Sequence, residues 1–164
     1  MQPMLLILLC SLQAFAAFER THHGSRSTAM GGSLVAMSNN AWSAFINPAG
    51  MKTLTRTLSL GYAPQIFEMK ELSHASASFV EPTSVGAFAL SASRFGFELY
   101  KETRISFSYA EELAGVVKGG VTVNYYSLSI QNYGSASAIG LDVGLLIDIA
   151  DNVTWGFAAM NVNA

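Results

Sequence analysis

From residue 55 onward, apolar side chains recur at every second position of the chain. The clearest run consists of Ile139, Leu141, Val143, Leu145 and Ile147, separated mostly by small or polar residues. Because successive side chains of a strand point to opposite faces, such a run predicts a β-strand with one apolar face. Seven strands are predicted in this way, near residues 57–62, 73–80, 84–94, 104–109, 121–126, 138–147 and 153–159.

The composition indicates that much of the surface does not face water. Charged residues make up 12% of the chain and apolar residues 51%, whereas an ordinary soluble domain has roughly 25% charged residues. A strand-rich chain with so few charges is typical of a protein that contacts lipid, and strands cross a bilayer when they close into a barrel. The formal net charge is -2 and no two Lys or Arg residues are adjacent, which argues against nucleic acid as a partner.

The predicted connections between the strands alternate in length. Those at 63–72, 95–102 and 128–137 contain roughly 8 to 10 residues, and those at 81–83, 111–115 and 148–151 contain roughly 3 to 5. Outer-membrane barrels alternate short periplasmic turns with longer external loops in this manner. The pattern predicts an all-β, antiparallel up-and-down transmembrane β-barrel, with a soluble periplasmic barrel or sandwich as the alternative.

Residues 1–17 have the features of a signal peptide. An apolar run extends from Met4 to Cys10, and small residues at 14–16 predict cleavage after Ala16 or Ala17. Cys10 is the only cysteine, so the mature chain is expected to contain neither a disulfide nor a thiol nucleophile. A lipoprotein attachment site at Cys10 is the alternative, but leucines precede this cysteine where small residues are required.

Residues 18–52 differ from both the signal peptide and the strands. A short helix is predicted here, capped by one of three residues, Ser38, Asn39 or Asn40. Its apolar face consists of Trp42, Phe45 and Ile46. The helix ends at the sequence Asn-Pro-Ala-Gly, because Pro48 disfavours helical dihedrals at Asn47 and Gly50 permits a reversal.

Two motifs in this segment resemble the FadL and PorV superfamily of bacterial outer-membrane barrels. They are Thr28-Ala29-Met30-Gly31-Gly32 and, after the predicted helix, Asn47-Pro48-Ala49-Gly50-Met51. The segments at 105–110, 119–125 and 140–146 are similar to successive strands of the PorV-type branch. The resemblance covers residues 25–162 and implies a barrel of about fourteen strands with residues 18–52 folded into the lumen as a plug. Residues 53–164 would then form the first seven strands, about half of the barrel, in a chain truncated at its C-terminus.

The candidate site residues fall into two sets. The resemblance implies a plug and ligand path formed by Trp42, Phe45, Ile46, Asn47, Pro48, Ala49 and Gly50, in which the turn is either a movable gate or a rigid anchor. The polar side chains expected to face the lumen are Arg94, Arg104, Asn124 and Asp142. Asp142 alternates with apolar neighbours and is therefore expected to point inward and to pair with Arg94 or Arg104.

No catalytic, metal or cofactor site is predicted. His22 and His23 are adjacent, would point apart in an extended segment, and have no nearby acid or cysteine to complete a metal shell. The serines lie in no Gly-x-Ser-x-Gly motif, so they do not indicate a hydrolase. The Met-Gly-Gly segment lacks the lysine of a phosphate-binding loop.

The resemblance implies a function in the bacterial outer membrane. The first expectation is passage of hydrophobic small molecules, such as long-chain fatty acids, through the plugged lumen, by a ligand-driven rearrangement of the plug. The alternative is a PorV-like accessory of a type IX-like protein secretion system, which binds exported proteins through its external loops. The expected partners are outer-membrane lipid together with either a hydrophobic small molecule or a secreted protein.

Overall fold

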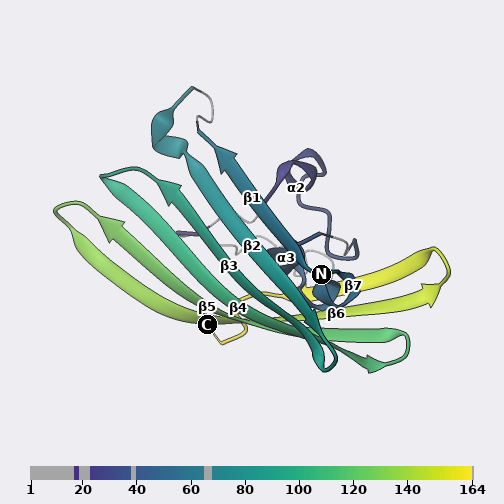
Figure 1. The fold of residues 1–164 in the computed structure, drawn as a ribbon. Coiled ribbons are helices and arrows are strands. Elements are labelled where there is room, and N and C mark those ends of the chain that lie inside the picture. The colour runs from purple at the N-terminus through teal and green to yellow at the C-terminus, as the bar shows by residue number, and fades with distance from the viewer. Residues whose placement is uncertain (1–16, 19–22, 38–39, 65–67, 164) are drawn as a thin grey trace, which may run out of the picture.

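The computed structural model contains one antiparallel β-sheet and several short helices (Figure 1). It describes residues 17–18, 23–37, 40–64 and 68–163. The strands are β1 (Thr57–Ala63), β2 (His74–Thr83), β3 (Gly86–Gly96), β4 (Tyr100–Ala114), β5 (Val117–Ile130), β6 (Gly134–Ala150) and β7 (Val153–Ala159). The helices are α2 (Ser25–Ala29), α3 (Ser43–Ile46) and the 3-10 helices η1 (Pro48–Thr53) and η2 (Lys70–Leu72). The strands pair in sequence order and the sheet curls into a half-barrel, which confirms the all-β, antiparallel prediction.

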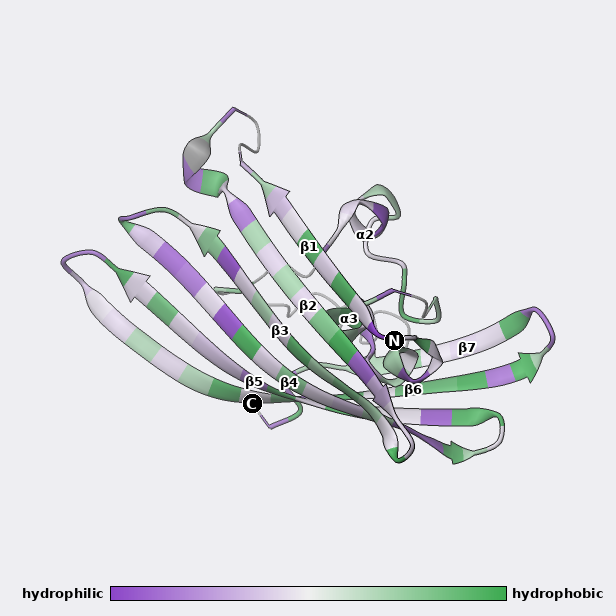
Figure 2. Ribbon diagram, viewed as in Figure 1, coloured by the Kyte–Doolittle hydropathy of each residue, from purple (hydrophilic) through white to green (hydrophobic). Residues whose placement is uncertain are grey.

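Along the central strands, polar and small side chains lie on the buried side of the sheet, and large apolar side chains lie on the exposed side. On β4, Arg104, Ser106 and Ser108 are buried, whereas the intervening Ile105 and Phe107 are 46% and 54% exposed. We call the side with the buried polar residues the concave face and the side with the exposed apolar residues the convex face. The alternation along the strands is visible in Figure 2.

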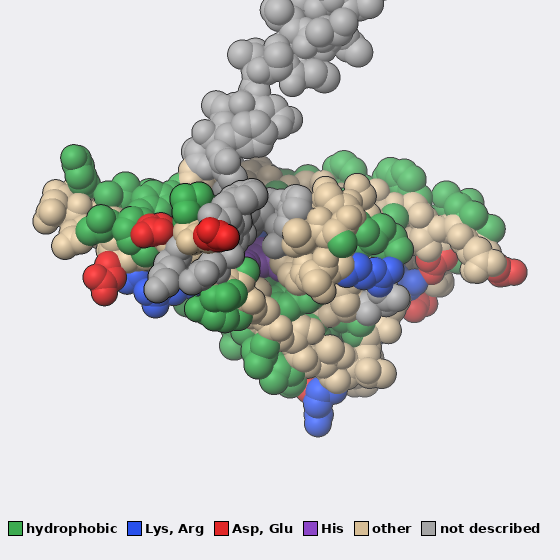
Figure 3. All heavy atoms as spheres, turned by 90° about the horizontal axis from the view of Figure 1, so that it is seen from above, with side chains coloured by type: hydrophobic (Ala, Val, Ile, Leu, Met, Phe, Trp, Pro, Cys, Tyr) green, Lys and Arg blue, Asp and Glu red, His purple; other side chains and the backbone are tan. Residues whose placement is uncertain are grey.

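The register of the strands joins the exposed apolar residues into continuous rows across the convex face. One row contains Leu58, Phe79, Leu90, Phe107, Val123 and Leu141, each between 36% and 62% exposed. The next row contains Leu60, Ala77, Ala92, Ile105, Tyr125 and Ile139. Figure 3, a view from above, shows hydrophobic side chains gathered in patches along the outline of the molecule. A one-sided soluble sheet has the opposite arrangement, with its apolar side packed on the core.

The N-terminal segment, residues 23–37 and 40–53, lies against the concave face. η1 contacts β3, β4, β5 and β6, and α3 contacts β3 and β4. The apolar core between segment and sheet is formed mainly by small side chains and consists of Ala41, Ala44, Met51, Leu54, Val80, Ala87, Ala89 and Ala110. The alanines allow the backbone of the segment to come close to the strands.

The prediction of long connections after the third and fifth strands is wrong. Residues 97–99 join β3 to β4, and residues 131–133 join β5 to β6. Pairing continues through segments whose outward side chains are small and polar, as where Ser129 pairs with Ser135. The connections at 84–85, 115–116 and 151–152 are short as predicted, and the one at 64–73 is long. Loop lengths therefore alternate far less than the sequence indicates.

β4, β5 and β6 are longer than predicted. β4 has 15 residues, more than its short alternating core indicates, because it pairs with β5 along almost its full length. β7 has 7 residues, with the bounds that the alternation predicts, and it pairs only with the second half of β6. It ends where the chain turns back toward the concave face and the backbone N–H of Asn161 donates to Asp142 Oδ1 at 2.8 Å.

Several predictions concern residues outside the described part of the chain. These are the signal peptide, of whose residues 1–17 only Ala17 is described, and the helix caps Ser38 and Asn39. Asn40 is described, and its Oδ1 accepts a hydrogen bond from the Trp42 N–H at 2.9 Å. This bond closes the turn before α3, whereas α3 itself has no side-chain cap. None of the described helices is long and apolar enough to cross a membrane.

Candidate functional site

The turn Asn47-Pro48-Ala49-Gly50 is fixed to the concave face by one side chain. Asn47 Nδ2 donates to the carbonyl oxygens of Leu145 on β6, at 3.1 Å, and of Val35, at 2.8 Å. Its Oδ1 accepts from the Ala49 N–H at 3.1 Å. Asn47 is only 2% exposed, so these bonds replace the water that the amide would bind in the unfolded chain. One residue therefore links three parts of the structure.

Two glycines of the sheet make room for this turn. Gly120 on β5 and Gly144 on β6 are cross-strand partners. A Cβ atom on Gly120 would lie 2.4 Å from the Ala49 nitrogen, and one on Gly144 would lie 2.8 Å from Pro48 Cδ. Both distances are shorter than real Cβ contacts, so neither glycine can be replaced unless the turn moves. We call this pair the glycine cradle.

The apolar residues predicted on one face of the short helix belong to one cluster. Phe45 and Ile46 are buried together with Leu34, and Trp42 packs against them. The imidazole of His23 stacks on the Phe45 ring, with centroids 3.9 Å apart. The face proposed to contact a ligand is thus covered by the protein's own side chains.

Beneath this cluster lies a buried polar network on β4, β5 and β6. Arg104 Nη2 donates to Asp142 Oδ2 at 3.0 Å, and Asn124 Nδ2 donates to the same oxygen at 2.7 Å. Arg104 Nε donates to Asn124 Oδ1 at 3.0 Å. Arg104, Asn124 and Asp142 are 7%, 0% and 4% exposed. A charge buried to this extent is tolerated only when it is paired and hydrogen-bonded, as here.

Arg104 also connects the network to the N-terminal segment. Its guanidinium carbon lies 5.1 Å from the ring centroid of Phe45 and 5.6 Å from that of Tyr126. Both distances fall within the range of cation–π attraction, which strengthens when the cation is shielded from water. Arg104 therefore holds the strands together on one side and the segment against them on the other.

The prediction that Arg94 faces inward is wrong, as the register of β2, β3 and β4 shows. Arg94 pairs with Ala75 on β2 and with Thr103 on β4. It is two residues from Ala92, which lies in an apolar row, so the two side chains point to the same face of the sheet. Arg94 is therefore on the convex face, and it is exposed. Of the two arginines predicted as partners of Asp142, Arg104 is therefore the one that forms the ion pair. Polarity favours an inward position for an arginine, but the period of two assigns residue 94 to the side of Leu90 and Ala92.

Beside Arg104, little open space remains between the segment and the sheet. The cavity beside Arg104 has a volume of about 20 Å³ and is also lined by Phe18, His74, Ser93, Phe95 and Glu102. This volume holds about one water molecule. A larger pocket of about 200 Å³ lies at one side, lined by Ala17, Phe18, Tyr126, Ala138, Ile139, Gly140, Asn161 and Asn163. Another pocket, of about 280 Å³, lies between the segment and the last strands and is lined by Arg26, Ala36, Met37, Thr53, Lys118, Asp148 and Thr154.

The sequence analysis missed the small hydroxyl residues of the concave face. Ser78 Oγ donates to the Ala41 carbonyl at 2.8 Å and lies 2.7 Å from Ser91 Oγ, and Thr122 Oγ1 donates to Ser108 Oγ at 2.7 Å. These residues alternate with the apolar rows, which is the signal that predicts their inward orientation. No group of three or more potential metal ligands occurs within the described ranges.

Comparisons with known proteins do not assign the chain to a family: no family model, no curated protein and no solved structure matches it. Its function must therefore be argued from the two faces of the sheet and from the contacts of the N-terminal segment.

Proposed function

We propose that the chain forms part of the wall of an outer-membrane β-barrel, with the N-terminal segment as its plug. The observation that carries this proposal is the orientation of the sheet, with apolar rows outward and a hydrogen-bonded polar face inward. Contiguous exposed apolar surface on this scale marks a contact with lipid or with another protein. An outward apolar band around a polar interior is the arrangement of transmembrane barrels.

The height of the apolar surface fits the thickness of a bilayer. On β6, outward apolar side chains recur from Ile139 to Ile149. These ten steps of about 3.3 Å cover about 33 Å along the strand, or about 23 Å across a membrane at a tilt of about 45°. On β4, Lys101 and Glu111 are also ten steps apart and enclose Ile105, Phe107 and Tyr109. The apolar band of known outer-membrane barrels is about 25 Å tall.

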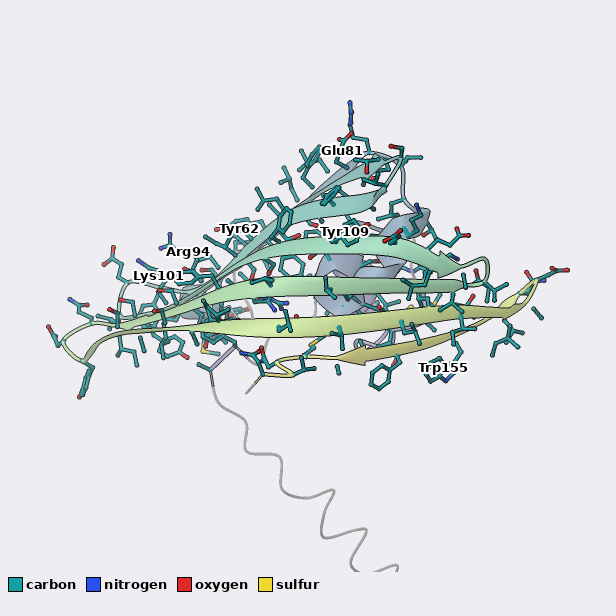
Figure 4. The ribbon with its side chains drawn as sticks, turned by 90° about the horizontal axis from the view of Figure 1, so that it is seen from below. Tyr62, Glu81, Arg94, Lys101, Tyr109 and Trp155 are labelled. Atoms are coloured by element: carbon teal, nitrogen blue, oxygen red, sulfur yellow. The ribbon has the colours of Figure 1, made fainter. Side chains whose placement is uncertain are left out.

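Aromatic residues lie at the borders of the apolar surface. Tyr62 ends the outward side of β1 and is 73% exposed, and Trp155 on β7 is 48% exposed. Figure 4 shows Tyr62 on the same side of the sheet as Arg94 and Lys101, and Trp155 far from it. Amphipathic rings prefer the level of the lipid headgroups, so this placement supports a membrane orientation of the strands.

We further propose that the barrel admits hydrophobic small molecules, of which long-chain fatty acids are the class implied by the resemblance to FadL. The support is the closed arrangement of the site: an aromatic cluster on the segment covers the polar network, and one asparagine and the glycine cradle hold the segment in place. Passage then requires the segment to move. The pocket beside Tyr126 and Phe18 offers an apolar surface for a first contact.

Substitution in the glycine cradle tests whether the N-terminal segment blocks passage. Gly120→Ala places a methyl group against the backbone of Ala49 and should displace the segment, whereas Gly119→Ala is the matched control. Gly119 is the preceding residue, faces outward, and its added Cβ would meet only the flexible side chain of Leu113. We expect Gly120→Ala to raise the entry of a fluorescent long-chain fatty acid into whole cells and Gly119→Ala to leave it unchanged.

Deletion of the gene completes the test. Loss of the protein should lower fatty-acid uptake, and uptake that is unchanged by deletion would contradict transport. Equal uptake by the Gly119→Ala and Gly120→Ala variants would show that the segment does not act as a plug.

A second candidate function is supported by the ends of the long strands. β5 and β6 continue beyond the apolar rows into a serine-rich hairpin, whose turn carries Tyr133, 88% exposed. The turn between β3 and β4 carries Leu99, 53% exposed. Exposed apolar residues on projecting turns suit the binding of an exported protein, as the resemblance to PorV implies. In that case deletion should abolish the appearance of secreted proteins at the cell surface and leave fatty-acid uptake intact.

A further inference from the structure

Charged side chains are distributed unevenly over the convex face. Only four stand at outward positions of the described strands: Arg94 and Lys101 toward one end, and Glu81 and Glu111 toward the other. The apolar rows lie between the two pairs. Figure 4 shows Arg94 and Lys101 beside Tyr62 and far from Glu81.

The two cations stand close enough to act on one ligand. Arg94 pairs with Thr103, and Lys101 pairs with Gly96, so the two residues are diagonal neighbours across β3 and β4. Such neighbours have Cβ atoms about 7–8 Å apart, a distance that two long side chains easily bridge. Thr103, at the same outward level, adds a hydroxyl group.

Neither cation is neutralised by a side chain in the described part of the chain. Arg94 and Lys101 form no ion pair with any described residue, whereas Arg104 and Lys118 each pair with an aspartate on the inward side. Glu98 follows in the turn at 97–99, outside the outward rows of the sheet. At the opposite border Arg56 binds Glu81 through both of its carboxylate oxygens, at 2.6 and 2.7 Å. Unpaired positive charge is thus confined to one border of the apolar surface.

We propose that Arg94, Lys101 and Thr103 bind the phosphate of an anionic membrane lipid. The inference rests on the proposed membrane location, because it needs acyl chains against the apolar rows and headgroups at their border. Long cationic side chains at the edge of an apolar band extend toward the headgroups, and Arg and Lys both make strong charge-assisted hydrogen bonds to phosphate. The site would also orient the barrel, with the Arg94 border in the leaflet that is richer in phosphate.

The test measures lipid selectivity beside the site. The full chain is used without Cys10, which is either substituted or removed together with the signal peptide. One sample carries Ser127→Cys, and the new cysteine is labelled with the fluorophore bimane. Residue 127 points outward and lies opposite Thr103. A second sample carries the label at Leu113→Cys near Glu111, at the other border. Each sample is assembled in vesicles that contain either phosphatidylglycerol or phosphatidylcholine, both carrying the same nitroxide-labelled acyl chain. The nitroxide quenches the bimane fluorescence when the lipid is bound beside the label. The two quenching curves give the ratio of the association constants of the two lipids.

We expect phosphatidylglycerol to be preferred about fivefold or more over phosphatidylcholine at residue 127. The attraction of a single Lys or Arg to an anionic membrane surface already accounts for a preference of about this size. The preference should fall to about one in Arg94→Gln/Lys101→Gln and persist in the control Arg56→Gln. At residue 113 the ratio should be close to one in every variant. A ratio near one at residue 127 in the parent, or a preference unaffected by Arg94→Gln/Lys101→Gln, overturns the site while leaving the membrane location intact. Absence of quenching by either lipid would refute both.

Discussion

The loss of folding stability caused by Phe107→Arg distinguishes a sheet that faces lipid from a sheet that faces water. Phe107 lies in the central apolar row between Leu90 and Val123 and is 54% exposed. On β4 it is six residues from Lys101 and four from Glu111, about 20 Å and 13 Å along the strand. It is therefore far from both charged borders.

The two environments predict different costs for Phe107→Arg. An arginine on the lipid face near the bilayer midplane costs about 2–4 kcal/mol, equivalent to a roughly 30- to 900-fold loss in the folding equilibrium. In water, the same change at a half-exposed position usually stays within about 0.5 kcal/mol. Thr103→Arg is the matched control, because residue 103 is outward on the same strand but lies at the border, where the cost is about 0–1 kcal/mol.

The assay is reversible folding of the full chain into phosphatidylcholine vesicles across a denaturant series. The fraction folded is read from the shift in electrophoretic mobility of the unheated protein. We expect Phe107→Arg to lose at least about 2 kcal/mol more than Thr103→Arg. Equal stability of the two variants, or a Phe107→Arg protein that is more stable than the parent, would refute the reasoning.

Two further predictions concern the concave face. Asp142→Ala leaves Arg104 buried without its carboxylate and should cost about 3–5 kcal/mol, whereas the double change Arg104→Met/Asp142→Leu should recover much of the loss in the same folding assay. A double variant no better than Asp142→Ala would show that the ion pair is not the source of the effect. Asn47→Ala removes the bonds to Val35 and Leu145 and should destabilise the docking of the N-terminal segment by about 1–3 kcal/mol, seen as faster hydrogen exchange in residues 40–53. Asn40→Ala is its control, because Asn40 bonds only within its own turn, and equal exchange in the two variants would contradict the assigned role of Asn47.

The period of two predicted the strands and the faces where large apolar residues alternate with polar ones. It failed at the serine-rich ends of β5 and β6, where the outward side chains are small, as at Ser129 and Ser135, and only the backbone register shows that pairing continues. The segment 128–137 therefore has the composition of a loop and the structure of a tight hairpin. Backbone hydrogen bonds need no hydrophobic contrast, so such extensions carry little signal in composition.

The site shows a similar limit of sequence reasoning. The alternation placed Asp142 inward, but the three-dimensional register was needed to choose Arg104 over Arg94 as its partner. The close approach of Pro48 to Gly120 and Gly144 joins residues that are far apart in the chain. A glycine within a strand indicates close packing in general, and only the fold shows which backbone fills the space.

The contact between the convex face and lipid is tested most directly by a nitroxide scan of β5 from Val121 to Tyr125. Single cysteines at these positions are labelled in the membrane-assembled full chain, and collisions with oxygen and with a water-soluble nickel chelate are measured. Lipid on the convex face predicts high oxygen and low nickel accessibility at 121, 123 and 125, and low values for both reagents at the buried positions 122 and 124. High nickel accessibility at 121, 123 and 125 would place the apolar face in water and contradict the membrane location.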